Sequence, residues 1–182
     1  MTVPQYLAAL AANTQTALTL ARQYSPAELA FRPVGDCSIA DLLEHICLSD
    51  DRTLRLLGCS SGLVAPISEV YGDKNLRKIL VDFKEKPRLT ESETAELKGL
   101  ATHAAFERCF LAQRQQLSTQ LASGQLVISN RAYRHAYLGE MTSTDWLYYL
   151  LHHTTRHLND IREVAQLLPP TLAQGRGAAP AP

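Results

Sequence analysis

Two histidines, His153 and His157, stand four residues apart in a segment whose apolar residues recur every three or four positions. In an α-helix this spacing places both imidazoles on one face, with Cβ atoms roughly 5–6 Å apart, so both rings can reach a single metal ion. One helix face cannot encircle an ion, so a third ligand has to come from another element. His45, at the edge of an apolar stripe that includes Leu42 and Ile46, is the best candidate.

The same pair of histidines is also compatible with half-buried, hydrogen-bonded side chains that bind no ion. Their position on a stripe with Trp146 and Ile161 favours ligation, because two buried imidazoles without a partner would be costly. Periodicity alone leaves both interpretations open. The segment is not the HExxH motif of zinc proteases, since Thr154 replaces the general-base glutamate. His152 points about 100° away around the helix and is predicted at the rim.

Helical periodicity and helix-start signals predict the elements that carry these histidines. We expect long helices over residues 3–24, 38–58, 91–124 and 142–168, a short helix after Ser25, and short helical pieces with loop over 60–90, including 75–83. Residues 126–128 could be extended, but a single run makes no sheet. Four long amphipathic helices without strand alternation predict an all-α, antiparallel four-helix bundle, with an insertion of short helices and loop between its second and third helices.

Composition predicts one domain over residues 1–168, followed by a flexible tail rich in Pro, Ala and Gly over 169–182. Lys plus Arg and Asp plus Glu number 18 each, a balance that disfavours nucleic acid and anionic membranes as partners. The four cysteines show neither CxxC spacing nor the density of a disulfide framework, and no apolar run approaches a membrane span. We therefore expect a cytoplasmic protein.

Three motifs resemble those of the DinB-like (damage-inducible) superfamily of metal-binding four-helix bundles. Residues 38–46, SIADLLEHI, resemble the signature of its second helix, whose histidine is the first metal ligand. Residues 134–161 resemble its last helix and the turn before it, with a Trp and then two histidines separated by three residues. The resemblance spans about residues 5–168. Ala136, Cys37 and Asp160 depart from the residues common in the family, and none of them removes a ligand.

The resemblance implies that His45, His153 and His157 bind a divalent ion, usually zinc or nickel and sometimes iron. Three imidazoles leave coordination positions open for water or substrate, as in a catalytic site rather than a structural one. The family includes metal-dependent thiol S-transferases that activate a low-molecular-weight thiol such as bacillithiol or mycothiol. The resemblance makes a homodimer an option, which the residues themselves do not fix.

Three functions remain open. The chain could be a metal-dependent transferase or hydrolase of small molecules, a non-catalytic module that binds metal or a small ligand as a sensor or detoxification sink, or a bundle that uses metal only for stability. Ser49 is well placed to support His45, whereas four carboxylates (Glu44, Asp50, Glu107 and Asp160) are predicted mainly as surface charges. Cys47 should point to another side, and Trp146 and Tyr149 should pack in the core.

Overall fold

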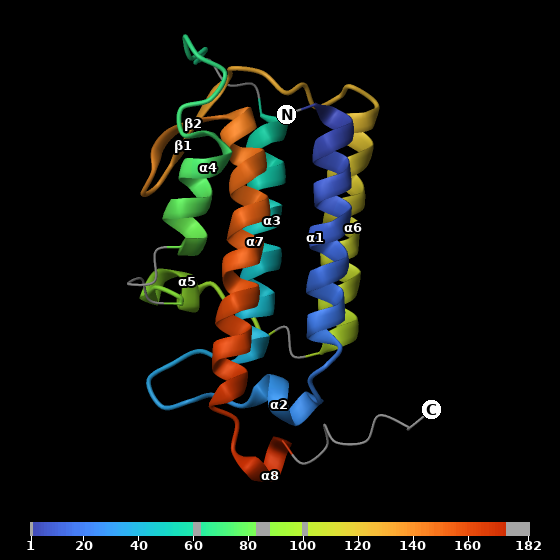
Figure 1. Cartoon of the computed structure of the whole chain (residues 1–182), viewed down its shortest axis with the longest axis vertical. Coiled ribbons are helices and arrows are strands. Elements are labelled where there is room, and N and C mark those ends of the chain that lie inside the picture. The colour runs from blue at the N-terminus through green and yellow to red at the C-terminus, as the bar shows by residue number, and fades with distance from the viewer. Residues whose placement is uncertain (1, 60–62, 83–87, 100–101, 174–182) are drawn as a thin grey trace.

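Four long helices form a bundle in the computed structural model (Figure 1). They are α1 (Val3–Ala21), α3 (Ile39–Gly58), α6 (His103–Ala122) and α7 (Ser143–Gln166). The structure describes residues 2–59, 63–82, 88–99 and 102–173. Both α1 and α3 pack against α6 and α7, so the helices enclose a common core. The predicted four-helix bundle is confirmed.

The direction of the helices explains the long connection between α3 and α6. α1 and α7 run one way and α3 and α6 the other (Figure 1), so the chain must return along the bundle before α6 can begin. The described part of this return contains α4 (Gly72–Arg77), the π-helix η1 (Lys78–Asp82) and α5 (Glu91–Ala95). This confirms the predicted insertion and gives it a topological cause.

Capping boxes begin most of these helices. In each box a Ser or Thr side chain accepts a hydrogen bond from the backbone three residues later, and the side chain there accepts one in return. The pairs are Thr2 with Gln5, Ser25 with Glu28, Ser38 with Asp41, Thr90 with Glu93, and Thr142 with Asp145. The starts predicted at Ser25, Ser38 and Thr142 are confirmed, the first of them opening α2 (Pro26–Ala30).

The prediction of one helix over residues 91–124 is wrong, because α5 and α6 are separate helices. Between them, the Glu44 carboxylate of α3 accepts hydrogen bonds from the backbone N–H groups of Lys98 and Gly99. Gly99 also has a φ of +83°, a left-handed conformation that ends a helix and suits glycine. The Glu44 carboxylate thus accepts the hydrogen bonds that these two N–H groups would donate to backbone carbonyl groups if the helix continued.

The expectation of no strands is also corrected. Residues Ala132–His135 (β1) and Gly139–Thr142 (β2) form an antiparallel hairpin in which Tyr133 lies opposite Met141. Strands of four residues are too short to show the alternation that identifies a strand in a sequence. Residues 126–128 belong to no strand.

A short helix, α8 (Pro170–Ala173), lies within the predicted tail, whereas residues 174–182 lie outside the described residues. Within the described chain, every helix is too short or too polar to cross a membrane.

A buried polar network joins the four long helices. The guanidinium of Arg114 in α6 donates from Nε to Asp50 of α3 at 2.7 Å, from Nη2 to Thr154 of α7 at 2.7 Å, and from Nη1 to Asn13 of α1 at 3.2 Å. The side chains of Arg114 and Asp50 are only 4% and 2% exposed. A buried cation without its partner is costly, so each member of this network depends on the others.

We predict that Asp50→Ala lowers the free energy of unfolding by about 3–5 kcal/mol, because Arg114 would remain buried without its anion. Asp51→Ala is the matched control, since Asp51 pairs with Arg55 on the exposed surface, where such pairs contribute about 1 kcal/mol or less. Urea denaturation of both variants measures the difference. Similar losses in the two variants would contradict the prediction.

Candidate metal centre

The three predicted ligands lie together in the bundle core. His45 comes from α3, and His153 and His157 come from successive turns of α7. Their exposed fractions are 4%, 5% and 2%. The Nε2 atom of His153 lies 3.1 Å from the Nε2 atoms of both His45 and His157. The nearest ring nitrogens of all three lie within 4.8 Å of one another, so the cluster could hold a metal ion.

The two distances of 3.1 Å fit a shared ion. Two nitrogens bound to one ion at about 2.0–2.1 Å lie about 2.8–3.4 Å apart at octahedral or tetrahedral angles. Hydrogen bonds satisfy the arrangement less well. The Nε2 atom of His153 has two imidazole neighbours, and one ring nitrogen is either a donor or an acceptor. One ion can instead accept the lone pairs of all three nitrogens.

The electrostatics keep the cluster in the form that binds metal. Burial, together with a smaller effect of the neighbouring His157, lowers the pKa of His45 to about 3. Burial and the neighbouring histidines also hold the pKa of His153 well below its ordinary value. Burial lowers the pKa of His157, although Asp160 opposes this shift. The three imidazoles are therefore neutral at neutral pH, as ligands must be.

Asp160 orients His157. Its Oδ2 atom lies 2.9 Å from Nδ1 of His157, so Nδ1 donates and Nε2 is left to face the cluster. The prediction that Asp160 is mainly a surface charge is wrong, since its side chain is only 16% exposed.

Two further carboxylates predicted as surface charges are buried. Glu44 is 3% exposed and binds the backbone between α5 and α6, and Asp50 belongs to the Arg114 network. Glu107 matches the prediction more closely, because it pairs with the exposed Arg22 at the surface. These three carboxylates bind backbone groups or pair with arginines, so their roles are structural.

Sequence reasoning missed a second carboxylate beside the cluster. Oε1 of Glu93 in α5 lies 3.8 Å from Nε2 of His45. Burial alone would raise the pKa of Glu93, but hydrogen bonds from Thr90 and the nearby imidazole of His45 hold it below its ordinary value. The capping box of Thr90 and Glu93 was a usable signal for the start of α5. The separation of α5 from α6, which brings Glu93 to His45, had no local signal.

The remaining predicted residues lie around the site or away from it. The support of His45 by Ser49 stays a prediction, because the hydrogen bond of Ser49 goes to the hydroxyl of Tyr149. The Tyr149 ring in turn stacks on His153 at a centroid distance of 5.1 Å. His152 points to the rim, where it contacts Asp73. Cys47 is buried, and burial raises the pKa of its thiol, so it is a poor nucleophile.

A cavity of about 430 Å³ opens beside the three histidines. Glu93 and Tyr149 line it, together with His135 from the end of β1. The hairpin therefore contributes to the site, because His135 also packs against Trp146 and Tyr149 at centroid distances of 5.3 and 5.0 Å. A small molecule in this cavity would contact both the histidine cluster and a carboxylate.

Comparison with known proteins gives a family and a fold. The family described as the DinB superfamily matches residues 9–161. The chain is also similar to a solved structure titled "Crystal structure of TT2238, a four-helix bundle protein", with 21% sequence identity and a TM-score of 0.53. The match covers 89% of this chain and 99% of that one, and it shows the shared fold. None of the curated proteins compared with the chain matches it.

We predict that acid destabilises the metal-free protein through these histidines. An unfolded histidine has a pKa of about 6.5, whereas burial lowers the pKa of all three here. Below that pH the unfolded chain binds more protons, so the free energy of unfolding falls as pH falls, by up to about 4 kcal/mol per pH unit for three protons.

Denaturation curves from about pH 7.5 to about pH 5 would test this. The control is a triple variant with Gln at positions 45, 153 and 157, in which the part of the slope due to these groups should vanish. Equal slopes in the two proteins would contradict the assignment.

Proposed function

The chain belongs to the DinB superfamily, and from this premise we propose that it is a metal-dependent small-molecule transferase of the thiol S-transferase type. In this proposal His45, His153 and His157 bind a divalent ion, for which zinc and nickel are the first candidates and iron the next. The substrates are a low-molecular-weight thiol and a small electrophile.

The observation that carries the proposal is the position of Glu93 beside the open side of the cluster. Its carboxylate lies 3.8 Å from the ring of His45 and lines the same cavity as the histidines. A site with only structural metal needs neither a cavity nor a carboxylate there, since structural zinc is normally closed by four protein ligands. A non-catalytic binding module would also have no use for a proton acceptor at this point.

In the proposed reaction, each group of side chains in the site has a separate role. A divalent ion held by three imidazoles supplies Lewis acidity, which lowers the pKa of a thiol. Glu93 is ionised at neutral pH and accepts the thiol proton at Oε1. Tyr149 and His135 form walls that orient the substrates. The sulfur lone pair then forms a bond to the electrophilic carbon, and the leaving group departs with the electron pair of the broken bond.

We predict that purified wild-type protein contains a divalent metal that His45→Ala and His153→Ala lose. His152→Ala is the matched control, because His152 is adjacent in sequence but points to the rim and contacts Asp73. Elemental analysis of the four proteins measures the bound metal. Equal metal content in all of them would refute the site.

We also predict that Glu93→Gln lowers kcat by about 10²–10⁴-fold, the usual contribution of a positioned proton acceptor, and leaves metal content unchanged. Gln can still complete the capping box with Thr90, so α5 should keep its place. The assay follows conjugation of L-cysteine to a chlorinated nitrobenzene. Glu91→Gln, an exposed change on the same helix, controls for altered surface charge. Unchanged kcat in Glu93→Gln would exclude this role.

A further inference from the structure

Two cysteines from neighbouring helices meet away from the histidine cluster. Cys47 lies on α3 and Cys109 on α6, and their thiol groups share a hydrogen bond. Both side chains line a cavity of about 640 Å³ beside these two helices. Among the described residues, none lines both this cavity and the one beside the histidines. The two thiols therefore form a separate cluster.

Further contacts hold this part of α6 against Cys47. Gln113 follows Cys109 by about one helical turn, so the two side chains lie on the same face of α6. The Nε2 atom of Gln113 donates a hydrogen bond to the backbone carbonyl of Cys47 at 3.0 Å. Cys109 itself packs against the buried core cluster that includes Cys47. An unstrained disulfide needs Cβ atoms about 3.5–4.5 Å apart, and thiols already in contact need the smallest movement to reach this geometry.

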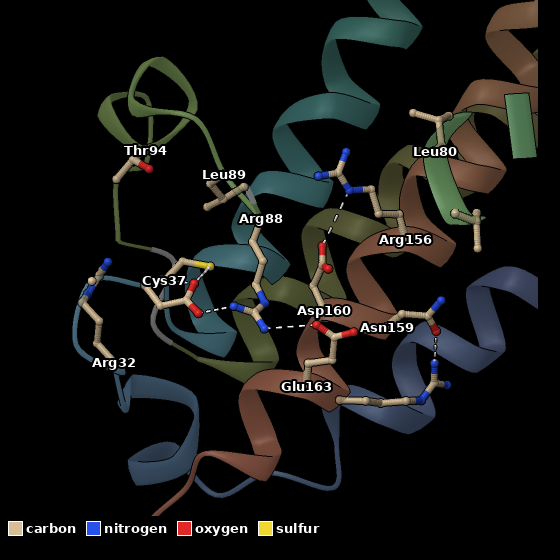
Figure 2. Close-up of a pocket in the computed structure, with 14 residues that line it drawn as sticks. Arg32, Cys37, Leu80, Arg88, Leu89, Thr94, Arg156, Asn159, Asp160 and Glu163 are labelled. Atoms are coloured by element: carbon tan, nitrogen blue, oxygen red, sulfur yellow. Dashed lines mark hydrogen bonds and ion pairs between the residues drawn. The ribbon is translucent and has the colours of Figure 1, made fainter. Parts of the chain in front are cut away.

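The two thiols differ in exposure. The side chain of Cys47 is only 2% exposed, whereas Cys109 is half-buried at the cavity wall. A small oxidant that enters the cavity therefore reaches Cys109 more easily than Cys47. Cys37 offers a contrast, because its thiol donates a hydrogen bond to the Asp36 carboxylate at 3.5 Å and lines a different cavity (Figure 2).

We propose that Cys47 and Cys109 form a site of reversible oxidation, at which a small hydroperoxide converts the two thiols into a disulfide that joins α3 to α6. The proposal goes beyond the proposed function and does not depend on it, because the site shares no residue with the cavity beside the histidines. The sequence alone gave no sign of this pair, since the two cysteines are far apart in the chain and show no motif spacing.

The reaction has two steps. The sulfur of Cys109 attacks one peroxide oxygen, and the O–O bond breaks. The other oxygen leaves with the electron pair and takes up the thiol proton, so that Cys109 becomes a sulfenic acid. The sulfur of Cys47 then attacks the sulfur of Cys109, the S–O bond breaks, and the departing hydroxide takes up the proton of Cys47 as water.

The electrons balance in this sequence. Two thiols are oxidised to one disulfide, and hydrogen peroxide is reduced to two molecules of water. Burial makes Cys47 a poor nucleophile toward molecules in solution, but it attacks a sulfur that it already contacts, so proximity replaces the encounter. A dithiol such as dithiothreitol reverses the reaction by thiol–disulfide exchange.

The test uses hydrogen peroxide on the full chain carrying Cys59→Ser, which removes the exposed thiol that would cross-link two molecules. We expect the number of free thiols, counted after denaturation, to fall from three to one. The intact mass should fall by about 2 Da, and dithiothreitol should restore both values. A tryptic digest without reductant should then link residues 23–52, which contain Cys47, to residues 109–114. An unchanged thiol count, or no such link, would overturn the proposal.

Cys37→Ser in the same background is the matched control, because Cys37 lies on the same tryptic peptide as Cys47. The mass loss and the link should persist in this variant, whereas Cys47→Ser and Cys109→Ser should abolish both. A mass loss of about 2 Da that persists in Cys109→Ser would show that Cys37 pairs with Cys47 instead and would refute the assignment.

The order of the two steps is tested by trapping the sulfenic acid with dimedone. In Cys47→Ser the intermediate has no partner thiol, so dimedone should label residues 109–114. In Cys109→Ser, residues 23–52 should remain unlabelled, because Cys47 and Cys37 are both buried. Labelling of residues 23–52 in place of residues 109–114 would contradict attack by Cys109 and overturn the proposed sequence of steps.

Discussion

The buried contact between Arg114 and Asp50 is the interaction on which the rest of the arrangement depends. A guanidinium in the core must have its charge and its hydrogen-bond donors satisfied, and a long side chain can reach its partners in only a few helix registers. Here the partners are Asp50 on α3 and Thr154 on α7. Asp50 lies a little over one turn beyond His45, and Thr154 is next to His153. The network that satisfies Arg114 therefore also fixes the register at which the ligand-bearing helices face each other.

Local signals in the sequence were enough for the two helices that carry the histidine cluster and for the pair of His153 and His157. Capping boxes at Ser38 and Thr142 begin the two helices that carry the ligands, and the periodic apolar positions indicate which face is buried. The apolar stripe of Leu42 and Ile46 made His45 the best candidate for a third ligand. The family resemblance was needed to select it, because no local pattern on α3 distinguishes a ligand from a half-buried histidine. Two residues on different helices become neighbours only in the folded protein, so a single sequence indicates such a pair only when its motifs resemble those of a known family.

The carboxylates show why the remaining features could not be predicted. An isolated Asp or Glu is usually exposed, so surface positions were the reasonable expectation for Glu44, Asp50 and Asp160. Each is instead held by a specific partner: Glu44 by backbone groups 54 and 55 residues away, Asp50 by Arg114, and Asp160 by His157. The first two partners are distant in sequence. The third is three residues away, but its importance depends on His157 being a ligand.

The break between α5 and α6 follows from the same kind of long-range contact and shapes the site. Because α3 and α6 run in the same direction (Figure 1), the chain must return along the bundle. Three residues of this return, Leu80, Thr90 and Glu93, line the cavity beside the histidine cluster. Glu44 ends the first part of this return by binding Lys98 and Gly99, which leaves α5 as a short helix with Glu93 next to His45. The core helices thus supply the histidines, whereas the connection supplies a carboxylate and part of the cavity wall. A change in this connection can therefore alter the shape and charge of the cavity without disturbing the packing that places the histidines.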